Sequence, residues 1–147
     1  MRSLLGAAIE EEADITLVDM EAGLEHLSRS GGTLAYADVL LVVMEPSRKS
    51  ILTAARTIPL AEELGLSRVY GVGNKARLPE DAEFFTEVAA EYKVPLAGIV
   101  PSDPEVAECD RLGVMLGPGR GQAVRDAVGR IVEFVDHAMA DDGVRSR

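Results

Sequence analysis

The sequence has few of the residues that build disulfide-linked, metal-cluster or nucleic-acid-binding proteins. Its 147 residues include one cysteine, Cys109, two histidines and no tryptophan. A single cysteine excludes an internal disulfide and cannot form a metal cluster alone, and this usage is typical of a reducing cytosol. The formal net charge of −10 leaves no basic surface for nucleic-acid phosphates or anionic lipids. We therefore expect a cytoplasmic protein that binds neither nucleic acid nor membrane.

Long apolar runs are also missing. No run reaches the ~20 residues that a membrane helix needs, and the first residues do not have the pattern of a signal peptide. The composition, 47% hydrophobic and 27% charged, is that of a folded soluble protein. We predict one α/β domain over residues 1–140 and a frayed tail over residues 141–147.

The chain does contain short apolar runs that alternate with longer amphipathic segments. Apolar runs between turn residues predict strands, and apolar residues at helical spacing predict helices. The expected strands are 14–18, 38–44, 68–72 and 96–100, and the expected helices are 3–12, 24–29, 47–64, 79–92, 104–112 and 122–140. Pro59 is expected to kink or divide its helix. This alternation predicts a mostly parallel sheet with helices on both faces.

Residues 14–23 form the first candidate site. The run 14–18 predicts a buried strand, and Asp19 follows at its carboxyl end, where open α/β sheets bind ligands. Gly23 has no Cβ to keep its backbone N–H away from an anion. An aspartate at a strand end with a glycine four residues later is typical of phosphate-binding switch loops, in which the aspartate reaches magnesium. The alternative is an ordinary aspartate turn.

Asn74 and Lys75 follow the third expected strand. The Asn74 amide can pair with a purine edge, and the Lys75 stem can lie along the ring face. Guanine readers of this type carry an aspartate two residues after the lysine. Here that residue is Arg77, which cannot accept a hydrogen bond, so adenine is favoured. The alternative is a turn in which Asn74 tolerates an unusual backbone conformation.

Pro101, Ser102 and Asp103 follow the last expected strand. In a parallel sheet this end lies at the same edge as the ends that carry Asp19 and Asn74, and its backbone groups can line a base pocket. Ser102 or Asp103 can also cap the next helix, with or without a role in binding.

Four runs occur in the order found in a known family: Asp19–Leu27 (DMEAGLEHL), Val42–Ser47 (VVMEPS), Gly73–Lys75 (GNK) and Pro101–Glu108 (PSDPEVAE). Over about residues 2–113 the chain resembles the carbon monoxide dehydrogenase nickel-insertion ATPases, a branch of the MinD/ParA-like P-loop group. The resemblance implies that Asp19 is the magnesium-side acid and Gly23 the γ-phosphate glycine. It also implies that Asn74 reads adenine, with Pro101 and Asp103 near the base.

The resemblance implies ATP or ADP with magnesium as cofactor, and a nickel enzyme such as carbon monoxide dehydrogenase as partner. The chain departs from the family because it has no Lys-Gly-Gly-x-Gly-Lys-Thr loop to hold the phosphates. The run Gly117–Gly121 lacks the Gly-Lys-Ser/Thr ending and is expected to be a connector. The family's Cys-x-Cys pair is missing too, and Cys109 is expected to be a lone buried thiol.

The sequence is therefore similar to the C-terminal portion of such an ATPase, an incomplete P-loop fold without the Walker A strand. In this family that strand lies between the strand ending at Asp19 and the strand 39–44. We expect those two strands to pair directly, or the chain to depend on a second chain, as a homodimer or with a separate N-terminal half.

Without the phosphate loop the chain alone is not expected to hydrolyse ATP. A non-catalytic α/β interaction module is the alternative function. A flavodoxin-like FMN domain is a third, and it needs a hydroxyl-rich phosphate loop that Met20, Glu21 and Ala22 do not supply.

Overall fold

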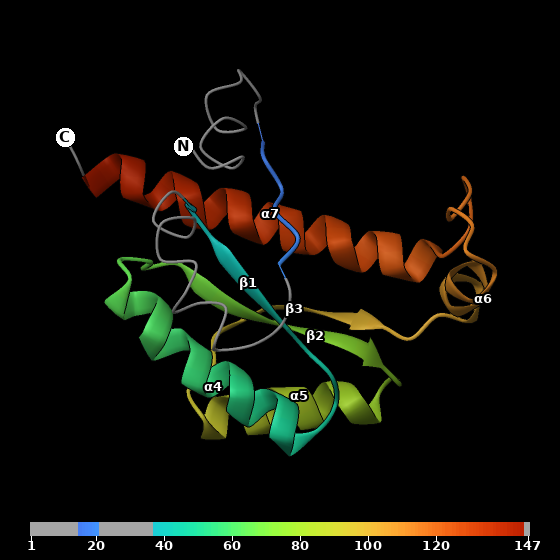
Figure 1. Ribbon diagram of the computed structural model, residues 1–147, viewed down its shortest axis with the longest axis horizontal. Coiled ribbons are helices and arrows are strands. Elements are labelled where there is room, and N and C mark those ends of the chain that lie inside the picture. The colour runs from blue at the N-terminus through green and yellow to red at the C-terminus, as the bar shows by residue number, and fades with distance from the viewer. Residues whose placement is uncertain (1–14, 21–36, 146–147) are drawn as a thin grey trace, which may run out of the picture.

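The fold is a small parallel sheet between two layers of helices (Figure 1). The computed structural model describes residues 15–20 and 37–145, with side chains to residue 140. The elements are β1 (Leu40–Met44), α4 (Arg48–Glu63), β2 (Val69–Ala76), α5 (Glu80–Glu91), β3 (Leu96–Pro101), α6 (Pro104–Leu112) and α7 (Gln122–Arg145). The strand order is β1-β2-β3 and both pairs are parallel. The predicted fold class is confirmed; the expected helices 3–12 and 24–29 lie outside the described residues.

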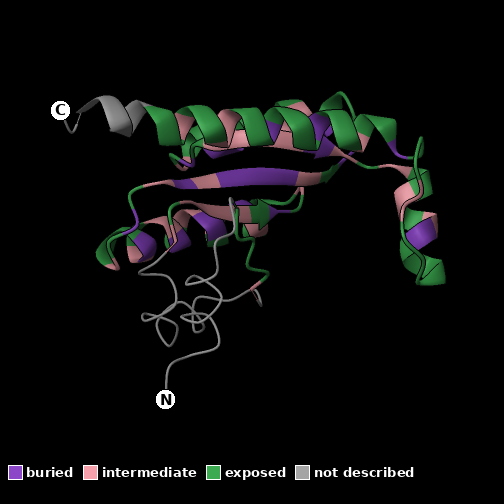
Figure 2. Ribbon diagram, turned by 90° about the horizontal axis from the view of Figure 1, so that it is seen from above, coloured by how far each residue is buried: buried purple, intermediate pink, exposed green. Residues whose placement is uncertain are grey.

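The helices cover opposite faces of the sheet (Figure 2). On one face, α4 and α5 pack over a core whose largest fully buried side chains are Phe85, Met44 and Ile51. On the other face, α7 packs against β3, with Ile131 buried among strand residues. The helix lies so close that a Cβ added to Gly98 would fall 2.6 Å from a side-chain carbon of Ile131. Helices therefore cover both faces of the sheet at β2 and β3.

Helix α4 continues through Pro59 without dividing. Ser47 caps its start by accepting a hydrogen bond from the Ser50 backbone N–H at 3.2 Å. Ile51 and Ala54 before the proline and Ala61 after it are buried against the sheet. Packing on both sides of Pro59 therefore keeps one helix where local propensity predicts a break.

Two elements are longer than expected. Strand β2 continues to Ala76, so it includes the Gly73–Lys75 run that was expected to follow it. Helix α7 continues to Arg145, beyond the expected end at Ala140. Within the described part of the chain, no helix is both long and apolar enough to cross a membrane.

The expected strand at residues 14–18 is not formed in its described part, since residues 15–20 have no regular secondary structure. Ile15 and Leu17 are 77% and 91% exposed, although the apolar run predicted burial. A strand needs a neighbour for its backbone hydrogen bonds, and among the described residues β1 pairs with β2 alone. The expectation of direct pairing between this segment and β1 is therefore wrong, while dependence on a second chain stays a prediction.

Candidate functional site

The end of β2 carries an irregularity at the two residues expected to bind a purine. Between Gly73 and Ala76 the register with β3 shifts, because three steps along β2 match two steps along β3. Lys75 has a φ of 55°, in the left-handed region that residues other than glycine rarely adopt. Such bulges redirect side chains at the rim of a sheet, and strained backbone of this kind is concentrated at functional sites. The end of β2 therefore combines a register shift with one left-handed residue, Lys75.

The Asn74 side chain is held against its own backbone. Its Oδ1 accepts a hydrogen bond from the Lys75 N–H at 2.9 Å, and the residue is half-buried. This bond uses one lone pair of the oxygen and leaves the amide NH2 for a ligand. The unusual backbone conformation expected at Asn74 occurs at Lys75 instead, and Asn74 itself belongs to β2. The role of Asn74 as a purine reader stays a prediction.

The end of β3 lies directly beside this bulge. The Ser102 N–H donates to the Ala76 carbonyl oxygen at 2.7 Å, which joins the two strand ends beyond the ladder. Asp103 caps α6, since its Oδ1 accepts from the backbone N–H groups of Glu105 at 2.8 Å and Val106 at 3.3 Å. The capping role expected for Ser102 or Asp103 therefore belongs to Asp103. Pro101 is the last residue of β3 and pairs with Ala76.

The end of β1 contributes Glu45, whose importance the sequence reasoning missed. Its Oε1 lies 3.0 Å from the Lys75 Nζ in an exposed ion pair. Met44 is in register with Gly73, so Glu45, just after β1, and Lys75, near the end of β2, are neighbours at the same edge. The pair depends on this register and on the bulge, so no residue pattern in the sequence predicted it.

The loop after β2 is closed by a second ion pair. Asp81 Oδ2 accepts from the Arg77 backbone N–H at 2.7 Å and from its Nε at 3.1 Å, and the Arg77 carbonyl oxygen accepts from the Asp81 N–H at 2.9 Å. The hydrogen bonds from the Arg77 side chain and backbone lower the pKa of Asp81, and Asp81 raises the pKa of Arg77. Arg77 thus directs its backbone N–H and side-chain donors to Asp81, and the preference for adenine over guanine stays a prediction.

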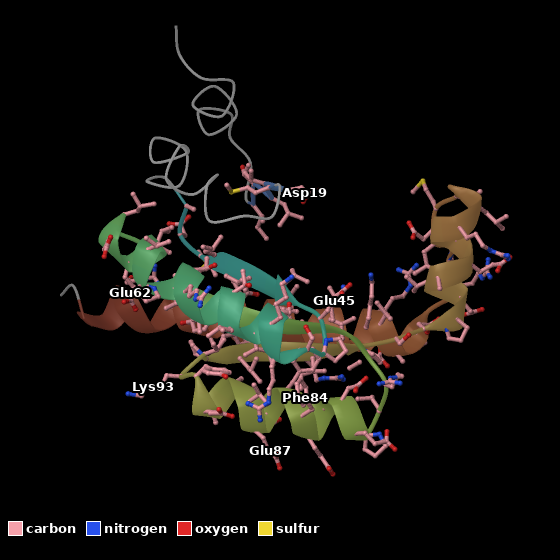
Figure 3. The ribbon with its side chains drawn as sticks, turned by 60° about the horizontal axis from the view of Figure 1, so that its bottom comes forward. Asp19, Glu45, Glu62, Phe84, Glu87 and Lys93 are labelled. Carbon is pink, nitrogen blue, oxygen red and sulfur yellow. The ribbon has the colours of Figure 1, made fainter. Side chains whose placement is uncertain are left out.

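The structure does not bring Asp19 to this edge. Asp19 is exposed, and its neighbour Met20 packs against Ala61, Leu66 and Val69, at the opposite end of β2. Figure 3 shows Asp19 on a segment separate from Glu45 at the end of β1. Gly23 lies outside the described residues. The structure therefore brings together the predicted site residues at the ends of β2 and β3, which are Asn74, Lys75, Pro101, Ser102 and Asp103. The roles of Asp19 and Gly23 stay predictions.

The sequence also drew attention to acidic and cysteine side chains and to the glycine-rich run. Among the described residues, no group of three or more His, Cys, Asp or Glu side chains is arranged to hold a metal ion. The run Gly117–Gly121 is a connector, as expected: Glu105 Oε2 accepts from the Gly121 N–H at 2.7 Å, and Arg125 donates to the carbonyl oxygens of Leu116 and Gly117. Cys109 is a buried thiol, 3% exposed.

Two surface hollows of about 340 and 250 Å³ lie away from the strand ends. The larger is on the outer face of α5, beside Glu87, and the smaller follows α4, beside Glu62; both residues are labelled in Figure 3. Each is lined by one short stretch of chain. Neither collects polar groups from several elements, so neither has the form of a ligand site.

Comparisons with known proteins show what the chain is similar to. The chain is 34% identical over 114 residues to the carbon monoxide dehydrogenase accessory protein CooC of Rhodospirillum rubrum, covering 78% of this chain and 42% of that protein. It is 37% identical over 114 residues to an uncharacterized ATP-binding protein of Methanocaldococcus jannaschii, covering 77% and 43%. The chain therefore spans less than half the length of these relatives. No protein-family model matches it.

A solved structure supports the fold. The MinD cell division protein of Aquifex aeolicus superposes with a TM-score of 0.57 at 20% identity, over 74% of this chain and 46% of that one. At this identity the likeness concerns the architecture, a parallel α/β sheet of the P-loop type.

Proposed function

The chain belongs to the CooC-like branch of the MinD/ParA-like P-loop proteins, and on this premise we propose that it forms the adenine-binding side of an ATP site. The observation that carries the proposal is the bulge at Asn74 and Lys75, fixed beside Ser102 at the carboxyl edge of the sheet. Open α/β sheets bind ligands at this edge. The Asn74 amide reads the base, and the backbone of Pro101–Asp103 lines the pocket.

The residues that would bind the phosphates are not found in this sequence. The sequence contains no Gly-x-x-x-x-Gly-Lys-Ser/Thr run, whose backbone N–H groups and lysine hold phosphates in P-loop proteins. We propose that a segment outside these 147 residues supplies the loop and its strand, and that Asp19 and Gly23 join the magnesium and γ-phosphate side once that strand is present. The strand order supports this proposal, because among the described residues β1 pairs with β2 alone and its other edge is open.

The name of the Rhodospirillum relative suggests the client. We propose that the assembled protein assists nickel insertion into an enzyme such as carbon monoxide dehydrogenase in the cytoplasm, with a separate N-terminal half or a second copy as its partner. The chain alone does not hydrolyse ATP in this proposal, because the lysines that stabilise transition-state charge are missing.

A non-catalytic interaction module is the second candidate. Exposed apolar side chains favour it: Leu112, Val114 and Met115, at the end of α6 and just after it, are 60%, 53% and 93% exposed. Isolated exposed apolar residues are ordinary, but three within four positions at and beyond a helix end suit a protein contact. In this alternative the bulge at Asn74 is only a turn and no nucleotide binds.

Titration of the purified chain with fluorescent ADP, with and without magnesium, separates the candidates. The adenine-side proposal predicts weak, millimolar binding that is independent of magnesium and is lost in Asn74→Ala. Thr86→Ala, on the outer face of α5, is the matched control and should bind as the unaltered chain does. Absence of saturable binding would favour the interaction module. Micromolar, magnesium-dependent binding would contradict the account of the missing phosphate loop.

A further inference from the structure

We infer that Glu45 is a positioning residue of the adenine site: its carboxylate anchors the Lys75 ammonium, so that the Lys75 methylenes form one wall of the base pocket. The inference rests on the proposed function, and it adds a residue for which neither the sequence motifs nor the comparisons suggest a role. Its basis is the 3.0 Å contact between Glu45 Oε1 and Lys75 Nζ, which joins the ends of β1 and β2.

Both backbone polar groups of Glu45, its N–H and its carbonyl oxygen, are hydrogen-bonded. Its N–H donates to the Ser50 Oγ at 3.0 Å, and its carbonyl oxygen accepts from the Ser47 N–H at 2.7 Å. Ser47 in turn caps α4. The carboxylate therefore projects from a hydrogen-bonded turn between β1 and the first residues of α4. This turn gives the flexible Lys75 side chain a fixed point to bind.

Lys75 is fixed at its other end. Its backbone has the left-handed φ of 55°, and its N–H donates to Asn74 Oδ1. With the backbone set by the bulge and the ammonium set by Glu45, the four-carbon stem is tied at both ends beside the Asn74 amide. A free lysine loses considerable side-chain entropy when its stem packs against a ligand. A stem that is already held loses less, and this preorganisation raises affinity.

The solvent exposure of the Glu45 and Lys75 side chains sets the expected size of the effect on adenosine binding. The side chains of Lys75 and Glu45 are 68% and 64% exposed, and ion pairs of this kind have small effects. We expect removal of the Glu45 charge to weaken adenosine binding by about two- to fivefold. The change should leave folding intact, because neither side chain belongs to a core cluster.

The experiment uses adenosine as the probe, because it has a base and no phosphate. The chain has three lysines, at positions 49, 75 and 93, so a sample labelled with ¹³C in lysine gives few methylene signals. A purine ring lying on the Lys75 stem shifts its methylene signals upfield through ring current. We expect adenosine to shift Lys75 and leave Lys49 and Lys93 unchanged.

Glu45→Gln should raise the adenosine Kd by about two- to fivefold and reduce the upfield shift. Lys75→Met keeps an apolar stem without the ammonium and should weaken binding to the same degree. The double variant should then be no weaker than either single one, because both remove the same anchor. Glu91→Gln removes the comparable exposed pair with Arg48, at 2.8 Å between α5 and α4, and should change nothing.

The outcomes separate this inference from the proposed function. An adenosine-induced shift at Lys75 with an unchanged Kd in Glu45→Gln would overturn the role of Glu45 and leave the adenine site in place. Additive effects in the double variant would overturn it as well. No adenosine binding by the unaltered chain would overturn both the role of Glu45 and the proposed site.

Discussion

Replacing Gly73 by alanine should destabilise the fold, because the strand end that carries the site is packed directly on the core. An ideal Cβ at Gly73 would lie 2.9 Å from Phe85 Cδ2 and 3.0 Å from its Cε2 and Cγ. Phe85 is fully buried, so its ring has no free space to enter. Carbon atoms attract each other best at about 3.5–4.0 Å, so the ring or the strand must move by roughly half an ångström or more.

The magnitude can be worked from two opposing terms. Overpacking a well-filled core costs about 1–3 kcal/mol. Gly73 is not among the described glycines with positive φ, so alanine can adopt its backbone conformation and recovers about 0.4–1 kcal/mol from the unfolded state. At the midpoints of these two ranges the net loss is about 1.3 kcal/mol, which lowers the Tm by about 3–5 °C for a domain of this size.

Thermal and urea unfolding followed by circular dichroism measure this loss. Gly129→Ala is the control, because no atom lies within 4 Å of its added Cβ in α7; it should raise stability by about 0.5–1 kcal/mol. Phe85→Leu should relieve the clash, so the double variant with Gly73→Ala should lose less than the sum of the single losses. A Gly73→Ala chain as stable as the unaltered one, or more stable, would refute the packing argument.

Three further predictions concern the cap, the loop and the sheet edge. Asp103→Ala removes the cap of α6 and should lower the free energy of unfolding by about 0.5–2 kcal/mol, whereas Asp103→Asn keeps most of it; equal urea midpoints for the two variants would contradict this. The pKa of Asp81 is lowered in the folded chain by Arg77, so its contribution is complete above the ordinary aspartate pKa and is lost as pH falls through the lower folded value. The stability difference between the unaltered chain and Asp81→Asn should therefore shrink on acidification below about pH 4, and a constant difference across that range would count against the pairing. Val43→Lys places a charge on the exposed edge strand and should reduce self-association in sedimentation velocity without lowering the Tm, because Val43 is 62% exposed; unchanged association would argue against an open edge at β1.

Much of the fold could be predicted from the sequence because its signals are local. The apolar run before Glu45 and the turn residues that bound α6 predicted elements close to those observed. Helix α6 was predicted with its observed bounds, since proline follows a good capping residue at its start and Gly113, with φ 64°, ends it. The division of the helix that Pro59 allowed does not occur, because core packing on both sides of the proline outweighs the local preference.

The segment at residues 15–20 could not be predicted in the same way. Its apolar pattern is that of a buried strand, but no strand among the described residues pairs with it. A strand is stabilised by its partners rather than by its own sequence. The same reasoning explains why Asp19 was expected at the edge with Asn74 and is found beside Met20 at the other end of the sheet.

The ion pair between Glu45 and Lys75 was missed for another reason. It depends on the register between β1 and β2 and on the bulge at Lys75, neither of which is encoded by a single residue pattern. The convergence of Asn74 with Ser102, by contrast, followed from the rule that parallel strands end at one edge, and the 2.7 Å bond from Ser102 to Ala76 fits it.

The most direct test of the central claim is a map of backbone amide shifts in the ¹⁵N-labelled chain during titration with ADP. The account predicts that the largest shifts occur at residues 73–76 and 101–103, with or without magnesium, and that Asn74→Ala abolishes them. The largest shifts at another place, such as the connector at residues 117–121, or no shifts at all, would contradict an adenine site at the carboxyl edge of the sheet.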